Sequence, residues 1–178
     1  GYDMYCRMLN DAVKRMKGEK PQEEFVTTMK IDMDAYIPST YIKSEFQKLD
    51  IYKRIAEIGS PEERYDLAEE LIDRFGEFPK QVDILLEIAV LKAKANKAYI
   101  TQVSLKNRQA ELMFDPKAPL HFEKTKEFLE QTKENIKLDT KGLPKFCIGF
   151  DATSNGMEQL QRLGEIVDCI SNLIDEEK

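Results

Sequence analysis

The sequence predicts an α+β protein in which amphipathic helices pack against an antiparallel or mixed sheet built from hairpins. Helical periodicity dominates the first half of the chain, and short strand-like segments dominate the second half. Turn residues separate most of the strands that are neighbours in sequence. Strands joined by such short turns pair in antiparallel fashion, and this favours an α+β fold over a parallel α/β fold.

The first half is expected to hold a helix, a strand and three further helices. Apolar residues recur at helical spacing over residues 3–17, where Gly18 ends the pattern. Residues 25–33 alternate strictly between two faces, as in a half-buried strand. A helix follows over about residues 44–58, and another over about residues 79–97. The apolar stripe predicted for that last helix comprises Val82, Leu85, Leu86, Ala89, Val90 and Ala93.

The clearest helix lies between Ser60 and Gly76. Ser60 is a good N-cap, Pro61 suits the first helical position, Glu63 completes a capping box, and Gly76 is a stop signal. At 100° per residue, the expected buried arc comprises Leu67, Ala68, Leu71, Ile72 and Phe75. The opposite arc is acidic and comprises Glu62, Asp66, Glu69, Glu70 and Asp73.

The second half is expected to form two hairpins and two helices. Residues 100–106 and 110–114 flank the turn Asn107-Arg108. The second hairpin joins residues 136–139 to residues 146–150 across a Lys-Gly-Leu-Pro turn. Helices are expected over residues 121–133 and over residues 156–174, and the latter is strongly periodic.

Composition describes a globular cytoplasmic protein of one main domain. The chain has 178 residues, 42% of them hydrophobic and 34% charged, with no apolar run of membrane-spanning length. Its three cysteines, Cys6, Cys147 and Cys169, are expected to be reduced and buried. With one histidine and no Cys-x-x-Cys motif, a zinc site is not expected.

No motif nominates catalytic chemistry. A phosphate-binding Gly-x-x-x-x-Gly-Lys-Ser/Thr loop and a Gly-x-Ser-x-Gly nucleophile motif are both absent. We expect His121 to be a surface or capping residue, and we expect the acidic end of the chain to be a solvated helix tail. The fragment is therefore predicted not to be an enzyme, and an uncharacterised small enzyme is the least favoured of three alternatives.

Charge is concentrated in one segment. Residues 57–77 contain eight acidic and two basic residues, a net charge of −6, which equals the net charge of the whole chain. Like charges at i,i+3 and i,i+4 spacing repel by about 0.2–0.5 kcal/mol per pair, and Asp73 sits at the unfavourable end of the helix dipole. Arg64 and Arg74 project toward the flanks of the helix. The acidic face is therefore predicted to bind a basic partner.

An alternative function is nucleic-acid binding by a lysine-rich helix end. This accessory site would comprise Lys92, Lys94, Lys97, Lys106 and Arg108. The low sequence pI, near 5.1, weighs against binding by bulk charge.

Four ordered motifs resemble one known family. They are Glu-Leu-Ile-Asp-Arg-Phe-Gly-x-x-Pro over residues 70–79, the segment 1–9, Asp-Ala-Tyr-Ile-Pro at 34–38 with Tyr-Ile at 41–42, and Tyr-Lys-Arg-Ile-Ala at 52–56. In this order they resemble the C-terminal domain (TRCF domain) of bacterial transcription-repair coupling factors, the Mfd family. The resemblance implies that residues 1–18 form a helix leaving a translocase module and that residues 19–178 form a single regulatory domain.

The same resemblance implies a function. Members of the family are ATP-dependent DNA translocases that remove stalled RNA polymerase and recruit nucleotide excision repair. The resembling domain has no catalytic role or cofactor of its own, whereas the parent would use ATP and magnesium. It docks on a UvrB-like N-terminal module, autoinhibits the motor and covers the surface that recruits UvrA. RNA polymerase and DNA would be indirect partners. The expected interface residues are Glu70 and Asp73, with Asp66, Glu69 and Arg74.

Overall fold

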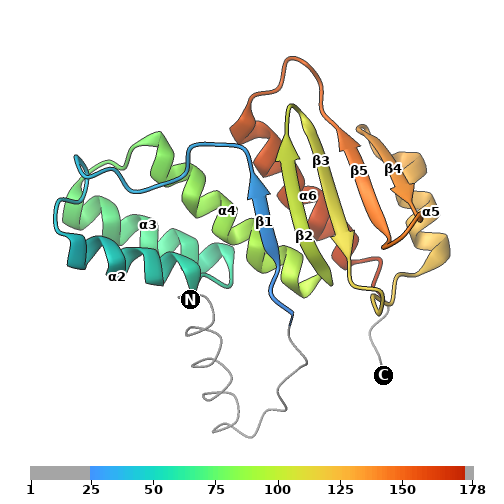
Figure 1. Ribbon diagram of the computed structural model, residues 1–178, viewed down its shortest axis with the longest axis horizontal. Helices are drawn as coiled ribbons and strands as arrows, with labels where there is room; N and C mark the ends of the chain where they lie inside the picture. The colour runs from blue at the N-terminus through green and yellow to red at the C-terminus, as the bar shows by residue number, and fades with distance from the viewer. Residues whose placement is uncertain (1–24, 175–178) are drawn as a thin grey trace, which may run out of the picture. The chain divides into compact units, whose positions relative to one another are not determined.

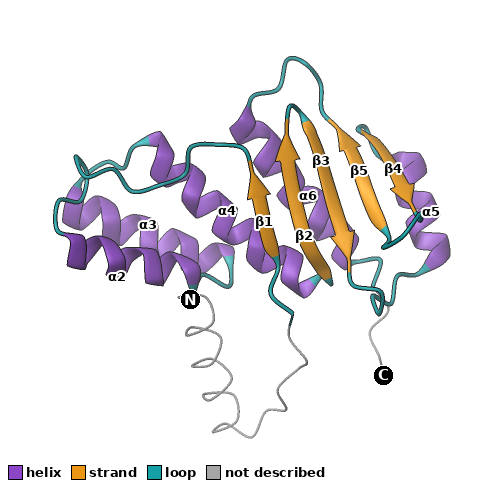
Figure 2. Cartoon of the chain, in the orientation of Figure 1, coloured by secondary structure: helices purple, strands orange, loops and turns teal. Residues whose placement is uncertain are grey.

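The computed structural model describes residues 25–174, so the helix expected over residues 3–17, with Cys6, lies outside the described residues. The described residues form five helices and one mixed five-stranded sheet, which confirms the α+β class (Figures 1 and 2). In chain order the elements are β1 (Thr28–Ile31), α2 (Glu45–Ala56), α3 (Pro61–Phe75), α4 (Lys80–Lys97), β2 (Ile100–Lys106), β3 (Gln109–Phe114), α5 (Phe122–Gln131), β4 (Asn135–Asp139), β5 (Lys145–Gly149) and α6 (Gly156–Ser171).

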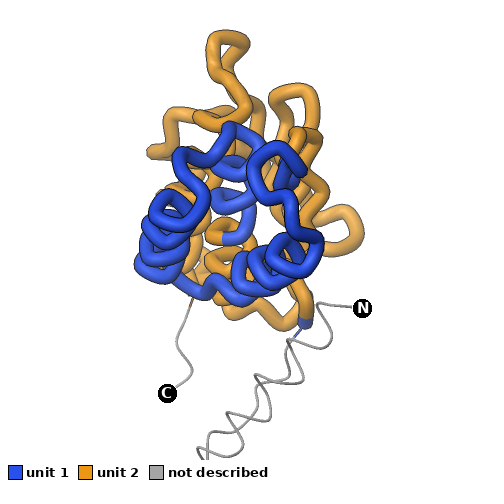
Figure 3. Tube along the Cα trace, turned by 90° about the vertical axis from the view of Figure 1, so that its left-hand side faces the viewer, with its two compact units in different colours: residues 1–25, 35–89 blue, residues 26–34, 90–178 orange. Residues whose placement is uncertain are grey.

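The described chain divides into two compact units (Figure 3). The helical unit contains Phe25 and residues 35–89, and the sheet unit contains residues 26–34 and 90–174. The boundary falls inside α4, between Ala89 and Val90, so this one helix contributes a half to each unit.

The helical unit has a core of aliphatic side chains from α2, α3, the first half of α4 and the loop segments before α2 and between α2 and α3. Ser44 caps α2, because its side chain accepts a hydrogen bond from the amide of Gln47. Ahead of α2, the Tyr52 hydroxyl accepts a hydrogen bond of 2.8 Å from the amide of Ile37. The buried residues are Ile37, Ile42, Ile51, Ile55, Ile58, Leu67, Leu71, Val82, Ile84 and Leu86.

The sheet unit has the strand order β1-β2-β3-β5-β4. The two predicted hairpins are confirmed, since β2 pairs with β3 and β4 pairs with β5 in antiparallel fashion. Two further strand pairings could not be predicted, because a short hairpin turn does not connect the strands. β1 runs parallel to β2 after a crossover that contains α2, α3 and α4, and β3 pairs with β5.

One face of the sheet is covered by helices and the other carries polar side chains. Figure 2 shows α5, α6 and the second half of α4 on one side of the sheet. The Phe128 ring of α5 lies 6.4 Å from the Phe146 ring of β5, and Lys94 of α4 pairs with Asp168 of α6 at 2.8 Å. Antiparallel sheets commonly have one solvated face, which explains the alternating burial of the strands.

The hairpin turn between β2 and β3 has the geometry that its two residues predict. Asn107 has φ 51° and Arg108 has φ 62°, so both central residues are left-handed, as a type I′ turn requires. Asparagine tolerates this conformation, whereas arginine does so at a cost. In the other hairpin, Gly142 supplies the positive φ, at 85°.

Several details differ from the sequence prediction. Cys169 is exposed and Cys147 is half-buried, so the expectation that both are buried is wrong. Ile72 is 43% exposed although it was assigned to the buried arc of its helix. Of the stripe predicted for α4, Val82, Leu86 and Val90 are buried, whereas Leu85, Ala89 and Ala93 are only half-buried, so the prediction is wrong for these three. Ile84, Leu91 and Ala95 are buried as well, because this helix is covered over a wider arc than a single amphipathic stripe.

Replacing Arg108 by glycine is expected to stabilise the chain by about 1 kcal/mol, because glycine adopts the left-handed conformation without the steric cost that a side chain carries. Urea unfolding of the wild type and Arg108→Gly measures this. The reverse change, Gly142→Ala, meets open space but a φ of 85°, so it should cost about 1 kcal/mol. Equal stabilities of all three chains would show that neither turn is strained as described.

Candidate docking face on helix α3

Helix α3 begins and ends at the residues that the sequence indicates. The Ser60 side chain accepts a hydrogen bond of 3.2 Å from the amide of Glu63, Pro61 opens the helix, and Gly76 ends it with φ 86°. The capping box differs in one detail. The Glu63 carboxylate accepts a hydrogen bond of 2.6 Å from the amide of Gly59, one residue before the N-cap, rather than from Ser60 itself.

The C-terminal end of α3 is fixed by Tyr41 from the segment before α2. The Tyr41 hydroxyl lies 2.8 Å from the carbonyl oxygen of Gly76 and 3.2 Å from that of Leu71, so it can donate a hydrogen bond to either carbonyl near the end of the helix. Its ring packs edge-on against Phe75, with centroids 5.9 Å apart. Burial, with a smaller contribution from the Glu77 carboxylate, raises the pKa of Tyr41.

Four acids form an exposed ridge along α3, which we call the acidic ridge: Glu62, Asp66, Glu69 and Asp73. Their spacing of four, three and four residues places them on one side of the helix. Within residues 25–174, no salt bridge involves any of the four. The ridge is therefore an unneutralised line of negative charge.

Both arginines of the acidic segment are bound elsewhere. Arg64 reaches the first half of α4, where its Nη2 atom lies 2.9 Å from Asp83 Oδ1 and 2.9 Å from Glu87 Oε1. Arg74 lies 3.0 Å from Glu70 on its own helix. Neither guanidinium group is directed to the acidic ridge, as the flank positions in the sequence predict.

Glu70 is the centre of an ion-pair cluster that the sequence did not reveal. Arg54 of α2 donates two hydrogen bonds to its carboxylate, Nη1 to Oε2 and Nη2 to Oε1, the latter at 2.9 Å. Arg74 donates a third, from Nη1 to Oε2, at 3.0 Å. The hydrogen bonds from Arg54, and secondarily the one from Arg74, hold the pKa of Glu70 below its ordinary value. We call this the Arg54–Glu70–Arg74 cluster.

The structure thus divides the five predicted interface residues into two groups. Asp66, Glu69 and Asp73 lie on the exposed ridge, whereas Glu70 and Arg74 belong to the cluster on its flank. Glu70 is half-buried rather than fully outward. The docking role of all five stays a prediction.

An apolar edge borders the ridge on its other flank. Tyr65 is 61% exposed and Ile72 is 43% exposed, and both lie within a turn of Glu69. A hydrogen bond with Glu69 raises the pKa of the Tyr65 hydroxyl. Helical geometry could have indicated Tyr65 from its i,i+4 relation to Glu69, but Ile72 was placed in the core.

The alternative basic site is not assembled as one surface. Lys94 of α4 is held by Asp168 at 2.8 Å, on the covered side of the sheet. Lys106 instead borders a hollow on the uncovered face, and Arg108 lies in the turn between β2 and β3. His121 caps α5 by accepting a hydrogen bond from the amide of Lys124, which confirms its predicted capping role.

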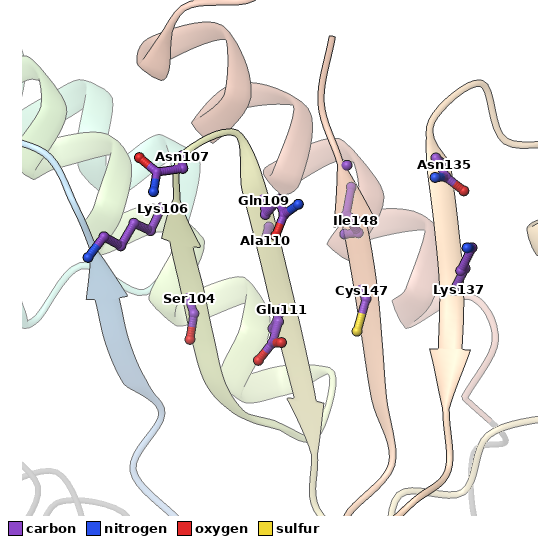
Figure 4. Close-up of a pocket in the computed structure, with 11 residues that line it drawn as sticks. Ser104, Lys106, Asn107, Gln109, Ala110, Glu111, Asn135, Lys137, Cys147 and Ile148 are labelled. Carbon is purple, nitrogen blue, oxygen red and sulfur yellow. The ribbon is translucent and has the colours of Figure 1, made fainter. Parts of the chain in front are cut away.

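The described surface includes two open hollows. One, of about 430 Å³, lies on the uncovered sheet face, and Ser104, Glu111, Lys137 and Cys147 point into it (Figure 4). The other, of about 420 Å³, lies in the helical unit and includes Arg54, Glu63 and Asp66. Among residues 25–174 there is no group of three or more side chains placed to hold a metal ion, and no helix long and apolar enough to cross a membrane.

Comparison with known proteins gives a consistent result. A family model described as the TRCF domain matches residues 31–125, which include α2, α3 and α4. The transcription-repair-coupling factor of Bacillus subtilis (strain 168) is 33% identical over 156 residues, which cover 80% of this chain and 13% of that protein. The corresponding protein of Staphylococcus haemolyticus (strain JCSC1435) is 37% identical over 120 residues, covering 66% of this chain and 10% of that protein.

A solved structure agrees with this assignment. A crystal structure of the C-terminal domain of a transcription-repair coupling factor has a TM-score of 0.72 and 28% sequence identity, and the match covers 85% of this chain and 97% of that one. The chain itself spans only about 13% of the Bacillus subtilis relative that it matches. Since the family model covers more than half of its residues, the chain belongs to the TRCF domain family of transcription-repair coupling factors.

Proposed function

We propose that this chain is a non-catalytic regulatory domain that docks by the acidic face of α3 on an arginine-bearing surface of its parent coupling factor. The partner is the UvrB-like N-terminal module that the family resemblance implies. Docking would keep the translocase motor and UvrA recruitment inactive until RNA polymerase is engaged. ATP and magnesium would be used by other modules of the parent, and RNA polymerase, UvrA and DNA would be reached through the full-length protein.

The observation that carries this proposal is the acidic ridge. Its four carboxylates repel one another, and the arginines of the segment are bound to Asp83, Glu87 and Glu70 instead of relieving that repulsion. A basic partner surface would turn the repulsion into attraction. The exposed Tyr65 and Ile72 border the same face, and tyrosine is among the residues that anchor protein interfaces.

The mechanism follows from differential binding. A domain that binds only the closed state shifts the equilibrium toward that state by its difference in affinity for the two states. A coupling free energy of about 1–3 kcal/mol represses roughly 5- to 150-fold. Attachment within one chain raises the effective concentration of the partner, so a polar interface of modest strength suffices.

Charge reversal on the ridge is expected to weaken docking at least roughly tenfold, because paired interfacial charges become repulsive. The variant is Glu69→Lys with Asp73→Lys, which leaves the Arg54–Glu70–Arg74 cluster intact. Binding to the purified UvrB-like module is measured by calorimetric titration at low and high salt. Wild-type affinity should fall as salt rises.

The matched control reverses two exposed acids of α5, Glu127→Lys with Glu130→Lys, which changes the net charge equally. Its affinity should stay close to that of the wild type. Equal weakening by both pairs would show that only bulk charge matters. Unchanged binding by the α3 variant would place the interface elsewhere on the domain.

Glu70 is expected to stabilise the helical unit as well. Glu70→Gln should lower the free energy of unfolding by about 1 kcal/mol at neutral pH, a small value because the side chains of Glu70 and Arg54 are 35% and 37% exposed and solvent screens the pair. The contribution of a carboxyl with a lowered pKa is present above its ordinary pKa near 4.5 and is lost as the pH falls through its folded value. The wild-type advantage should therefore shrink on acidification.

Urea unfolding at several pH values measures this effect, with Glu69→Gln as the control. Glu69 is exposed on the same helix and should change stability by less than about 0.5 kcal/mol. A wild-type advantage over Glu70→Gln that is independent of pH would contradict a stabilising ion pair.

A further inference from the structure

We infer that Arg54 is a built-in competitor for the carboxylate of Glu70, so that a partner engages this part of α3 by exchanging its own guanidinium group for that of Arg54. The inference rests on the proposed docking function. It adds the residue of this chain that limits the affinity for the arginine-bearing partner.

The acceptor capacity of Glu70 makes the exchange necessary. A carboxylate offers about four lone-pair positions. Arg54 occupies two of them with its paired hydrogen bonds, and Arg74 occupies a third. A single remaining position cannot accept the two parallel hydrogen bonds of a further arginine. A partner arginine can therefore bind Glu70 in the bidentate mode only after Arg54 has left.

The cluster is accessible enough for exchange without unfolding. The side chains of Arg54, Glu70 and Arg74 are 37%, 35% and 38% exposed. Asp73 lies three residues beyond Glu70 on the exposed ridge, where an incoming guanidinium group can bind first. Ion pairs at this degree of exposure are individually weak, so replacing one by another carries little net cost.

Arg54 has acceptors at hand once it releases Glu70. Asp50 lies four residues before it in α2 and Glu57 three residues after it, the two spacings at which helix side chains meet. The hydrogen bond to Glu70 is the main cause that raises the pKa of Arg54, but the charges of Asp50 and Glu57 contribute too. Arg54 can therefore pair with carboxylates on or next to its own helix after it leaves Glu70.

Arg74 remains bound to Glu70 during the proposed exchange. It lies on the same helix as Glu70 at i,i+4 spacing, and its guanidinium carbon lies 4.9 Å from the centre of the Phe75 ring. That stacking holds it in place. With Arg54 bound, the cluster carries two positive charges and one negative charge, so it opposes a basic partner at the edge of the ridge. Without Arg54 the cluster is neutral.

The exchange itself can be tested with a hexa-arginine peptide as the probe. The side-chain carboxyl carbon signals of Glu70 and Asp73 are followed by NMR during a low-salt titration of the wild-type chain and of Arg54→Met. The carboxyl carbon signal of Asp73 should shift during the titration in both chains. The carboxyl carbon signal of Glu70 should shift strongly in Arg54→Met and weakly in the wild type. In Arg54→Lys its shift should be closer to that of the wild type.

Three results would overturn the inference. Equal responses of Glu70 in the wild type and Arg54→Met would show that Arg54 blocks nothing. A Glu70 signal that does not shift in either chain would show that the guanidinium groups of the peptide do not bind this carboxylate. An Asp73 signal that does not shift would show that the acidic ridge does not bind guanidinium groups. Circular dichroism of Arg54→Met controls for loss of fold, and Arg54→Lys retains the cationic side chain.

The effect on docking is measured with the UvrB-like module in a double-mutant cycle. Arg54→Met should bind roughly three- to fivefold more tightly than the wild type, the range expected for loss of one partly exposed competing ion pair. In a Glu70→Gln background the same change should have a clearly smaller effect, because the contested carboxylate is gone and only the charge of Arg54 remains to be removed.

A gain of equal size in both backgrounds would mean that Arg54 acts only through net charge, and unchanged or weaker binding of Arg54→Met would likewise overturn the inference. Absence of binding by every chain, with the peptide response of Glu70 still dependent on Arg54, would instead contradict docking of the separate domain on this module and leave the competition for Glu70 established.

Discussion

A local shortage of positive charge on α3 is the physical constraint that shapes the surface of the helical unit. The helix concentrates carboxylates along one side, and its two arginines are bound by other partners, Arg64 by the acids of α4 and Arg74 by Glu70. The same ion pairs that tie α3 to its neighbours therefore leave its outer side uncompensated. Under the proposed function stability and binding are linked, because the arginines that stabilise the helical unit are not available to neutralise the acidic ridge.

This arrangement suits the proposed function, in which the domain dissociates from its partner when the parent protein is activated. An interface built on aliphatic burial would resist salt and release slowly, whereas one built on partly exposed charges associates quickly and is easily outcompeted. The Arg54–Glu70–Arg74 cluster lies between these extremes. It orders two helices of the unit while keeping all three side chains at the surface.

The sequence predicted those features that depend on neighbouring residues. The caps of α3, the turn at Asn107 and Arg108, and the alternation in β1 all follow from residues a few positions apart. It could not give the pairing of β3 with β5, which have α5 and β4 between them in the chain. The partner of Glu70 was missed for the same reason, since Arg54 lies sixteen residues away on another helix and no spacing rule connects them. The ridge acids Asp66, Glu69 and Asp73 were found because helical geometry alone places them.

Carboxylate footprinting is the measurement that tests the docked state most directly. The chain by itself, and a full-length coupling factor that carries it as its C-terminal domain, are labelled with carbodiimide and glycine ethyl ester and compared by mass spectrometry. Asp66, Glu69 and Asp73 should be labelled in the isolated chain and protected in the full-length protein, while the exposed Glu127 and Glu130 of α5 should react equally in both. Equal labelling of the ridge in the two proteins would contradict a docked α3.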